Sequence, residues 1–92
     1  LYSETAIAGE KYRGLWGGKA KSSFEILATS PLLVNYCYLG KCGKVSPSGN
    51  LNEMKWAFPG GKMTLKKVGN RYYGRHKLNN SSTVSQGTFL PQ

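Results

Sequence analysis

Few side chains in this sequence have the types and spacing that catalysis needs. The only carboxylates are Glu4, Glu10, Glu25 and Glu53, and the chain contains no Asp. General acid–base catalysis by paired carboxylates needs two that converge, and nothing in this spacing brings two together. A Ser/His/Asp triad lacks its Asp, although a Glu could take that role. His76 is the only imidazole. We therefore expect a protein that is not an enzyme and that uses no cofactor.

His76 has two interpretations. It is either a polar group or single general base at the mouth of a cavity, or a core or rim histidine hydrogen-bonded to a tyrosine. A ribonuclease-like site would require a carboxylate or a second His beside cationic groups. The cations are plentiful, but that partner is missing.

The two cysteines, Cys37 and Cys42, are separated by four residues that include Gly40. This spacing suits a disulfide across a tight loop at a strand end, and closing so short a ring adds roughly 2 kcal/mol. A zinc site is disfavoured, because there is no CxxC pair and only one His. The alternative is two unpaired thiols. A disulfide predicts an oxidising compartment, so that the protein is secreted or periplasmic.

The charge is strongly unbalanced, with 13 Lys and Arg against four acidic residues and a net charge of +9. This favours a polyanionic partner such as nucleic acid, acidic polysaccharide or anionic lipid head groups. The alternative is an evenly charged soluble surface, since outward lysines also protect sheet edges. The densest basic and aromatic row is predicted on an outward strand face. It comprises Lys66, Lys67, Arg71, Tyr73, Arg75 and Lys77.

The elements that position these residues are strands. Apolar and polar residues alternate between Gly49 and Leu78, with turns at Pro59-Gly60-Gly61 and Gly69-Asn70, which predicts a three-stranded meander. No long run has an apolar 3.6-residue period, and none approaches the ~18–20 apolar residues of a membrane span. Because the chain begins with Leu1, we expect a processed or trimmed chain. Further strands are expected at 11–16, within 19–28, at 32–39 and at 83–90.

Seven strands with short connections predict one all-β domain, a small antiparallel up-and-down barrel spanning residues 11–92. Pairing of the last strand with the first would remove exposed edges. Residues 1–10 are expected to form an N-terminal arm, and residues 40–50 a loop with a short extended piece at Lys44–Val45.

Two segments share the pattern basic, Tyr, any residue, Gly, any residue, large ring. They are Lys11–Trp16 and Arg71–His76. A Gly at the centre of an inward row lets a strand bend and lets a ring from across the barrel fill the gap. The alternative to simple core packing is a small cavity lined by inward aromatic residues. The cavity hypothesis names Tyr12, Gly14, Trp16, Tyr36, Trp56, Tyr72, Gly74 and His76.

Three short motifs resemble the calycin barrels, the group that contains lipocalins and avidins. They are Gly14-Leu15-Trp16 on the first strand, the run Gly69–Gly74 that opens a late strand, and the terminal Gly87–Leu90. The chain is most similar to small secreted bacterial barrels of this kind. It departs from the family in its shorter length, in having seven rather than eight strands, and in lacking a closing helix. The resemblance implies a barrel with a binding mouth and no catalysis.

These observations favour a binding or interaction module for a small apolar ligand or a protein partner. A partner could dock on an outward apolar patch formed by Leu15, Leu27, Leu33 and Leu39. The alternative function is the binding of a polyanion through the basic and aromatic strand face.

Overall fold

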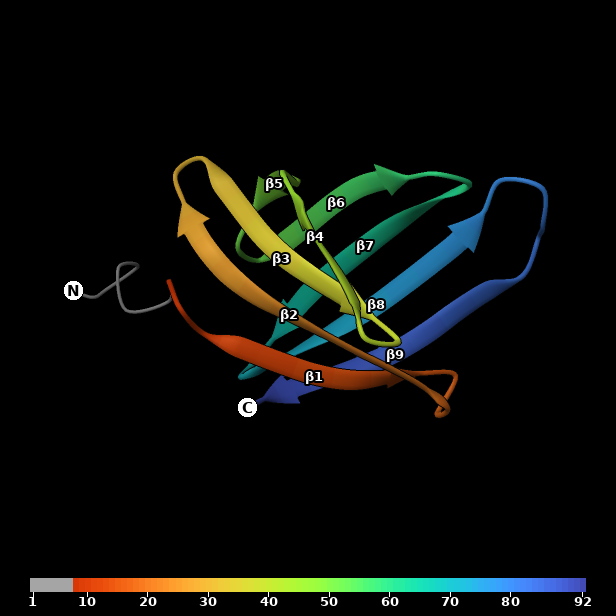
Figure 1. Cartoon of the computed structure of the whole chain (residues 1–92), viewed down its shortest axis with the longest axis horizontal. Helices are drawn as coiled ribbons and strands as arrows, with labels where there is room; N and C mark the ends of the chain where they lie inside the picture. The colour runs from red at the N-terminus through yellow and green to blue at the C-terminus, as the bar shows by residue number, and fades with distance from the viewer. Residues whose placement is uncertain (1–7) are drawn as a thin grey trace.

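The computed structural model describes residues 8–92, which form a single antiparallel sheet of nine strands with no helix in this part of the chain (Figure 1). The strands lie in the order β4-β3-β2-β1-β9-β8-β7-β6-β5. Their bounds are β1 Lys11–Trp16, β2 Ala20–Thr29, β3 Leu32–Tyr38, β4 Lys41–Val45, β5 Ser48–Asn50, β6 Glu53–Phe58, β7 Gly61–Val68, β8 Arg71–Leu78 and β9 Val84–Pro91.

The sheet curls into a half-barrel (Figure 1). Strands that follow each other in the chain are paired with one exception, and β1 also pairs with β9. The predicted all-β meander and the pairing of the last strand with the first are therefore confirmed. The exception is β4 and β5, which are neighbours in the chain but form the two free edges of the sheet. The sheet thus has nine strands and an opening, where seven strands in a closed ring were expected.

The two additional strands lie in the segment 40–50 that was expected to be a loop. Leu39 and Gly40 form a two-residue turn with φ values of 51° and 83°. Positive φ at both positions matches the twist of a tight hairpin, so the chain reverses at once and β4 pairs with β3. Pairing, rather than any apolar alternation in the sequence, makes this segment a strand.

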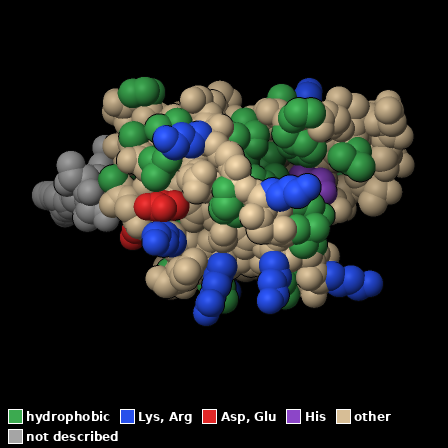
Figure 2. Space-filling model, in the orientation of Figure 1, with side chains coloured by type: hydrophobic (Ala, Val, Ile, Leu, Met, Phe, Trp, Pro, Cys, Tyr) green, Lys and Arg blue, Asp and Glu red, His purple; other side chains and the backbone are tan. Residues whose placement is uncertain are grey.

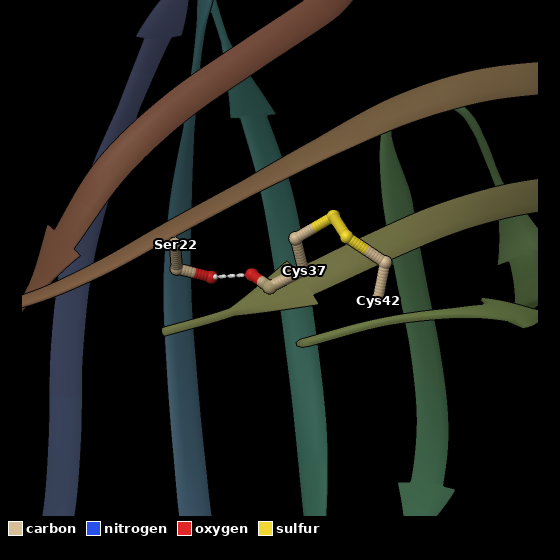
Figure 3. The surroundings of a disulfide bond; sticks show 3 residues. All are labelled: Ser22, Cys37 and Cys42. Atoms are coloured by element: carbon tan, nitrogen blue, oxygen red, sulfur yellow. Dashed lines mark hydrogen bonds between the residues drawn. A yellow bond between two sulfur atoms is a disulfide. The ribbon is translucent and has the colours of Figure 1, made fainter. Parts of the chain in front are cut away.

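The predicted disulfide between Cys37 and Cys42 is confirmed, and it joins two residues that face each other directly across β3 and β4. Figure 3 shows this bridge beside Ser22 of β2, whose hydroxyl donates a hydrogen bond of 2.7 Å to the carbonyl of Cys37. The edge strand is therefore held to the body of the sheet by a covalent bond.

The predicted alternation holds on the inner face. The meander buries Met54, Met63, Leu65 and Tyr72, and their outward neighbours are mostly exposed. Such burial of one face provides most of the free energy that holds a small sheet folded. The whole core consists of Tyr12, Trp16, Phe24, Ile26, Leu32, Val34, Met54, Met63, Leu65, Tyr72 and Phe89.

Two glycines allow the close packing inside the curl. A Cβ at Gly14 would lie 2.2 Å from the backbone oxygen of Thr88, so only Gly lets β1 approach β9 at this point. A Cβ at Gly74 would lie 2.6 Å from the ring of Trp16. The Trp16 ring occupies the space that Gly74 leaves, as a gap-filling ring was predicted to do.

Residues 9 and 10 of the predicted arm lie along β2. The Gly9 amide donates to the Ile26 carbonyl over 2.7 Å, and the Ile26 amide donates to the Glu10 carbonyl over 3.0 Å. Residues 1–7 of the predicted arm lie outside the described residues. Within residues 8–92 no helix is long and apolar enough to span a membrane.

Candidate functional site

The two ends of the half-barrel differ, and one of them is closed by aromatic rings. Phe24 stacks on Tyr12 with ring centroids 5.0 Å apart, and Tyr72 meets both rings edge-on at 4.9 and 5.2 Å. The Tyr72 hydroxyl donates to the Leu51 carbonyl over 2.7 Å, and the Tyr12 hydroxyl to a Glu10 carboxylate oxygen over 3.0 Å. Burial raises the pKa of Tyr72 to about 12 and also raises the pKa of Tyr12. Both phenols therefore stay protonated and keep donating.

The opposite end carries the turns β1–β2, β3–β4, β6–β7 and β8–β9 (Figure 1). A pocket of about 320 Å³ lies here, which we call the mouth pocket. Its walls come from the inner face of β3, β6, β7 and β8, and five of its six side chains are aromatic or aliphatic. The lining residues are Tyr36, Tyr38, Phe58, Met63, His76 and Leu78. Figure 2 shows hydrophobic side chains gathered around the histidine on the right-hand half of the visible face.

Behind the mouth pocket, Trp16 and Trp56 support its aromatic wall. The Trp16 indole N–H donates a hydrogen bond of 2.9 Å to the Tyr36 hydroxyl. The Tyr36 ring meets Trp56 edge-on at 5.6 Å. Burial raises the pKa of Tyr36, so its hydroxyl remains neutral and keeps a proton to donate. These contacts fix the orientation of the Tyr36 ring at the edge of the pocket.

His76 lies between aromatic rings at the same end. Its imidazole meets the Trp16 ring at 4.6 Å and the Phe58 ring at 6.2 Å, both edge-on. Its Nδ1 is buried and has no hydrogen-bond partner among the described residues. Burial lowers the pKa of His76, because the apolar surroundings disfavour the imidazolium. The ring is therefore neutral at physiological pH, and the site combines an apolar wall with one uncharged polar edge.

This lowered pKa makes the stability of the fold depend on pH. The unfolded chain has a His76 pKa near 6.5, so in mildly acidic solution it binds more protons than the folded chain. The free energy of unfolding should therefore fall as pH drops from about 7.5 to 5, and the variant His76→Gln should lose less over the same range. Urea denaturation at several pH values measures this difference. Parallel curves for the two proteins would contradict the burial of a neutral His76.

The structure separates the residues of the predicted cavity into two groups. Trp16, Tyr36, Trp56 and His76 converge behind and beside the mouth pocket, whereas Tyr12 and Tyr72 close the other end. The space between them, beside Gly74, is filled by the side chains of Trp16, Leu65 and Phe89. Beside Gly14 lies the backbone of β9 rather than a cavity.

Sequence reasoning did not select the four remaining side chains of the mouth pocket, Tyr38, Phe58, Met63 and Leu78. All four are aromatic or aliphatic residues on the inner face of their strands, and the alternation in the sequence was the available signal. Alternation alone does not show that the ends of four strands meet around an unfilled space.

The predicted polyanion-binding residues share one strand face with one exception. Arg71, Tyr73, Arg75 and Lys77 are exposed on β8, and Lys66 of β7 lies directly opposite Tyr73. Lys67 instead lies opposite the inward Tyr72, on the other face of β7. Of the outward leucines, Leu15 and Leu39 are exposed, and Leu27 and Leu33 are half-buried. Among residues 8–92, no group of three His, Cys, Asp or Glu side chains is placed to hold a metal ion.

Comparisons with models of known protein families, with curated proteins and with solved structures found no match for this chain. The resemblance to calycin barrels therefore stays a prediction, and the function must be inferred from the geometry.

Proposed function

We propose that this protein is a non-enzymatic binding module that holds a small, planar, largely apolar ligand in the mouth pocket. One observation carries the proposal: aromatic side chains of β3 and β6, together with His76 of β8, surround a space that the protein's own core leaves unfilled. Ligand pockets typically enclose about 300–1,000 Å³ and combine apolar walls with a few polar groups. The volume of about 320 Å³ falls at the lower end of that range.

The chemistry of the walls favours an aromatic ligand. Tyr36, Tyr38 and Phe58 offer ring faces and edges, and such ring pairs contribute about 0.5–1.5 kcal/mol beyond the burial of their area. The neutral His76 and the Tyr36 hydroxyl offer hydrogen bonds without the cost of burying a charge. A phenol or a similar ring with one polar substituent matches both features.

The proposal also includes the calycin-like barrel and the secreted or periplasmic location that the sequence predicts. The calycin-like cup remains part of the proposal on the sequence motifs alone, and the nine strands and the free edges of β4 and β5 depart from the expected ring of seven. The Cys37–Cys42 disulfide supports a secreted or periplasmic location, where such bonds persist.

A titration with 1-naphthol, a planar phenol, tests the pocket. We expect saturable binding by calorimetry, and we expect Leu78→Asp to weaken it at least about tenfold, because a carboxylate would stand in the apolar wall. The matched control is Leu39→Asp, which adds the same charge at an exposed position outside the pocket. Equal weakening by the two variants, or no saturable binding by the unmodified protein, would contradict the proposal.

A further inference from the structure

A second surface lies on the outer face of the sheet. It is basic, whereas the mouth pocket is largely apolar. Six exposed side chains of β1, β2, β7 and β8 form what we call the basic belt. They are Arg13, Leu15, Lys21, Lys66, Tyr73 and Arg75.

The strand register places four of these side chains in one line across the sheet. Lys66 lies opposite Tyr73, Tyr73 opposite Thr88, Thr88 opposite Leu15, and Leu15 opposite Lys21. The line therefore runs over β7, β8, β9, β1 and β2 with a cation at each end and the uncharged side chains of Tyr73, Thr88 and Leu15 between them. Neighbouring strands are about 4.8 Å apart, so the line is roughly 19 Å long.

The two arginines lie on either side of this line. Arg75 follows Tyr73 by two residues on β8, and Arg13 precedes Leu15 by two residues on β1. Both arginines line one shallow hollow of about 630 Å³ in the outer face, together with Leu15 and Tyr73. A second hollow shares Arg13 and Leu15 and continues to Lys21. From Tyr73 to Lys21 the belt is therefore a continuous shallow track, and Lys66 lies opposite Tyr73 at its end.

No belt cation forms an ion pair within the described part of the chain. The one ion pair found among residues 8–92 joins Lys55 to Glu53 at 3.9 Å, and Glu53 lies opposite Lys66 at one end of the belt. Figure 2 shows Lys and Arg side chains projecting in a row from the lower edge of the molecule, where β1, β2 and β9 lie in Figure 1. Unpaired cations on one face of a chain with a net charge of +9 attract an anionic partner.

We propose that the basic belt binds a linear acidic polysaccharide along the line from Lys66 to Lys21. Sugar rings have apolar faces that suit Tyr73 and Leu15, and their carboxylate or sulfate groups suit guanidinium forks and ammonium groups. Sequence-tolerant binding of single-stranded nucleic acid uses successive aromatic platforms, and the belt offers one ring. Disulfides persist in oxidising compartments outside the cytoplasm, where acidic polysaccharides also occur, so the disulfide agrees with this choice of partner. The proposal is independent of the mouth pocket.

Calorimetric titration with heparin and alginate oligosaccharides at two salt concentrations tests the belt. An oligothymidylate of equal charge represents the alternative ligand class, single-stranded nucleic acid. We expect the double variant Arg13→Gln/Arg75→Gln to weaken oligosaccharide binding about tenfold or more and to reduce its salt dependence. Tyr73→Ala should weaken binding roughly two- to tenfold with an unchanged salt dependence, and Tyr73→Phe should restore it.

The matched control is Lys44→Gln/Lys67→Gln, which removes the same charge from β4 and from the opposite face of β7, at positions that line neither hollow of the belt. Binding close to that of the unmodified protein is expected for this control. Equal losses in the two double variants would show that net charge alone attracts the glycan and would overturn the proposal. Tighter binding of the oligothymidylate than of either oligosaccharide would assign the belt to nucleic acid instead, and the absence of oligosaccharide binding at low salt would also overturn it.

Discussion

Replacing Gly14 with alanine is expected to lower the free energy of unfolding by about 2–4 kcal/mol, although it adds only one methyl group. The added Cβ would lie 2.2 Å from the Thr88 carbonyl oxygen and 3.0 Å from its carbon. These are backbone atoms of a paired strand, so they cannot rotate away as a flexible side chain would. The clash can be relieved only if β1 and β9 move apart. This pairing joins the first strand of the sheet to the last.

Gly43→Ala is the matched control, because Gly43 also lies within a strand and an added Cβ there meets nothing within 4 Å. We expect this variant to be neutral or stabilised by up to about 1 kcal/mol, since alanine restricts the unfolded chain. Urea denaturation of both variants measures the difference. Equal effects at the two positions would show that β1 and β9 do not approach as closely as described.

Trp16→Ala is expected to cost about 3–5 kcal/mol, the range for removing a large buried ring. The ring fills the space over Gly74, contacts Phe89 at 5.4 Å and donates to Tyr36. Its removal therefore leaves a cavity and takes the Trp16 donor away from the Tyr36 hydroxyl at the back of the mouth pocket. If the variant is too unstable to study, Trp16→Leu tests the same contact with a smaller loss.

The contact between Trp16 and Gly74 predicts strong coupling between the two positions. Gly74→Ala alone should cost about 1–3 kcal/mol, because its Cβ meets the Trp16 ring at 2.6 Å. After Trp16 is truncated, the same methyl group enters vacated space, and its cost should fall by at least about 1 kcal/mol. A double-mutant cycle in urea measures this. Additive effects would mean that the ring does not occupy the position over Gly74.

Much of the fold can be predicted from the sequence because alternation and turn residues act locally. The meander of β6, β7 and β8 follows from inward residues such as Met54 and Leu65 and from the breaks at Pro59 and Gly69. The strand β4 could not be predicted in this way. Its residues are mostly exposed on both faces, so its conformation depends on the Leu39–Gly40 turn and on its pairing with β3.

The candidate site was only partly predictable, for a geometric reason. Tyr12 and Trp16 lie on the same face of one strand, but four residues of strand span about 13 Å. Their counterparts Tyr72 and His76 are equally far apart on β8. The repeated pattern therefore places two tyrosines at the closed end and two rings at the end that holds the mouth pocket, rather than around one cavity. Consecutive residues also face opposite ways, which separates Lys67 from Lys66.

The two free edges of the sheet have a consequence for the mouth pocket. Tyr36 and Tyr38 belong to β3, on one side of the opening between β4 and β5, and Phe58 belongs to β6, on the other. No ladder of hydrogen bonds connects these two walls directly; the hydrogen-bonded path between them runs the long way round through β1 and β9. Across the opening they meet through side chains, as in the contact of Tyr36 with Trp56. The distance between the two walls is therefore set by the aromatic side chains packed between them, and not by backbone hydrogen bonds across the opening.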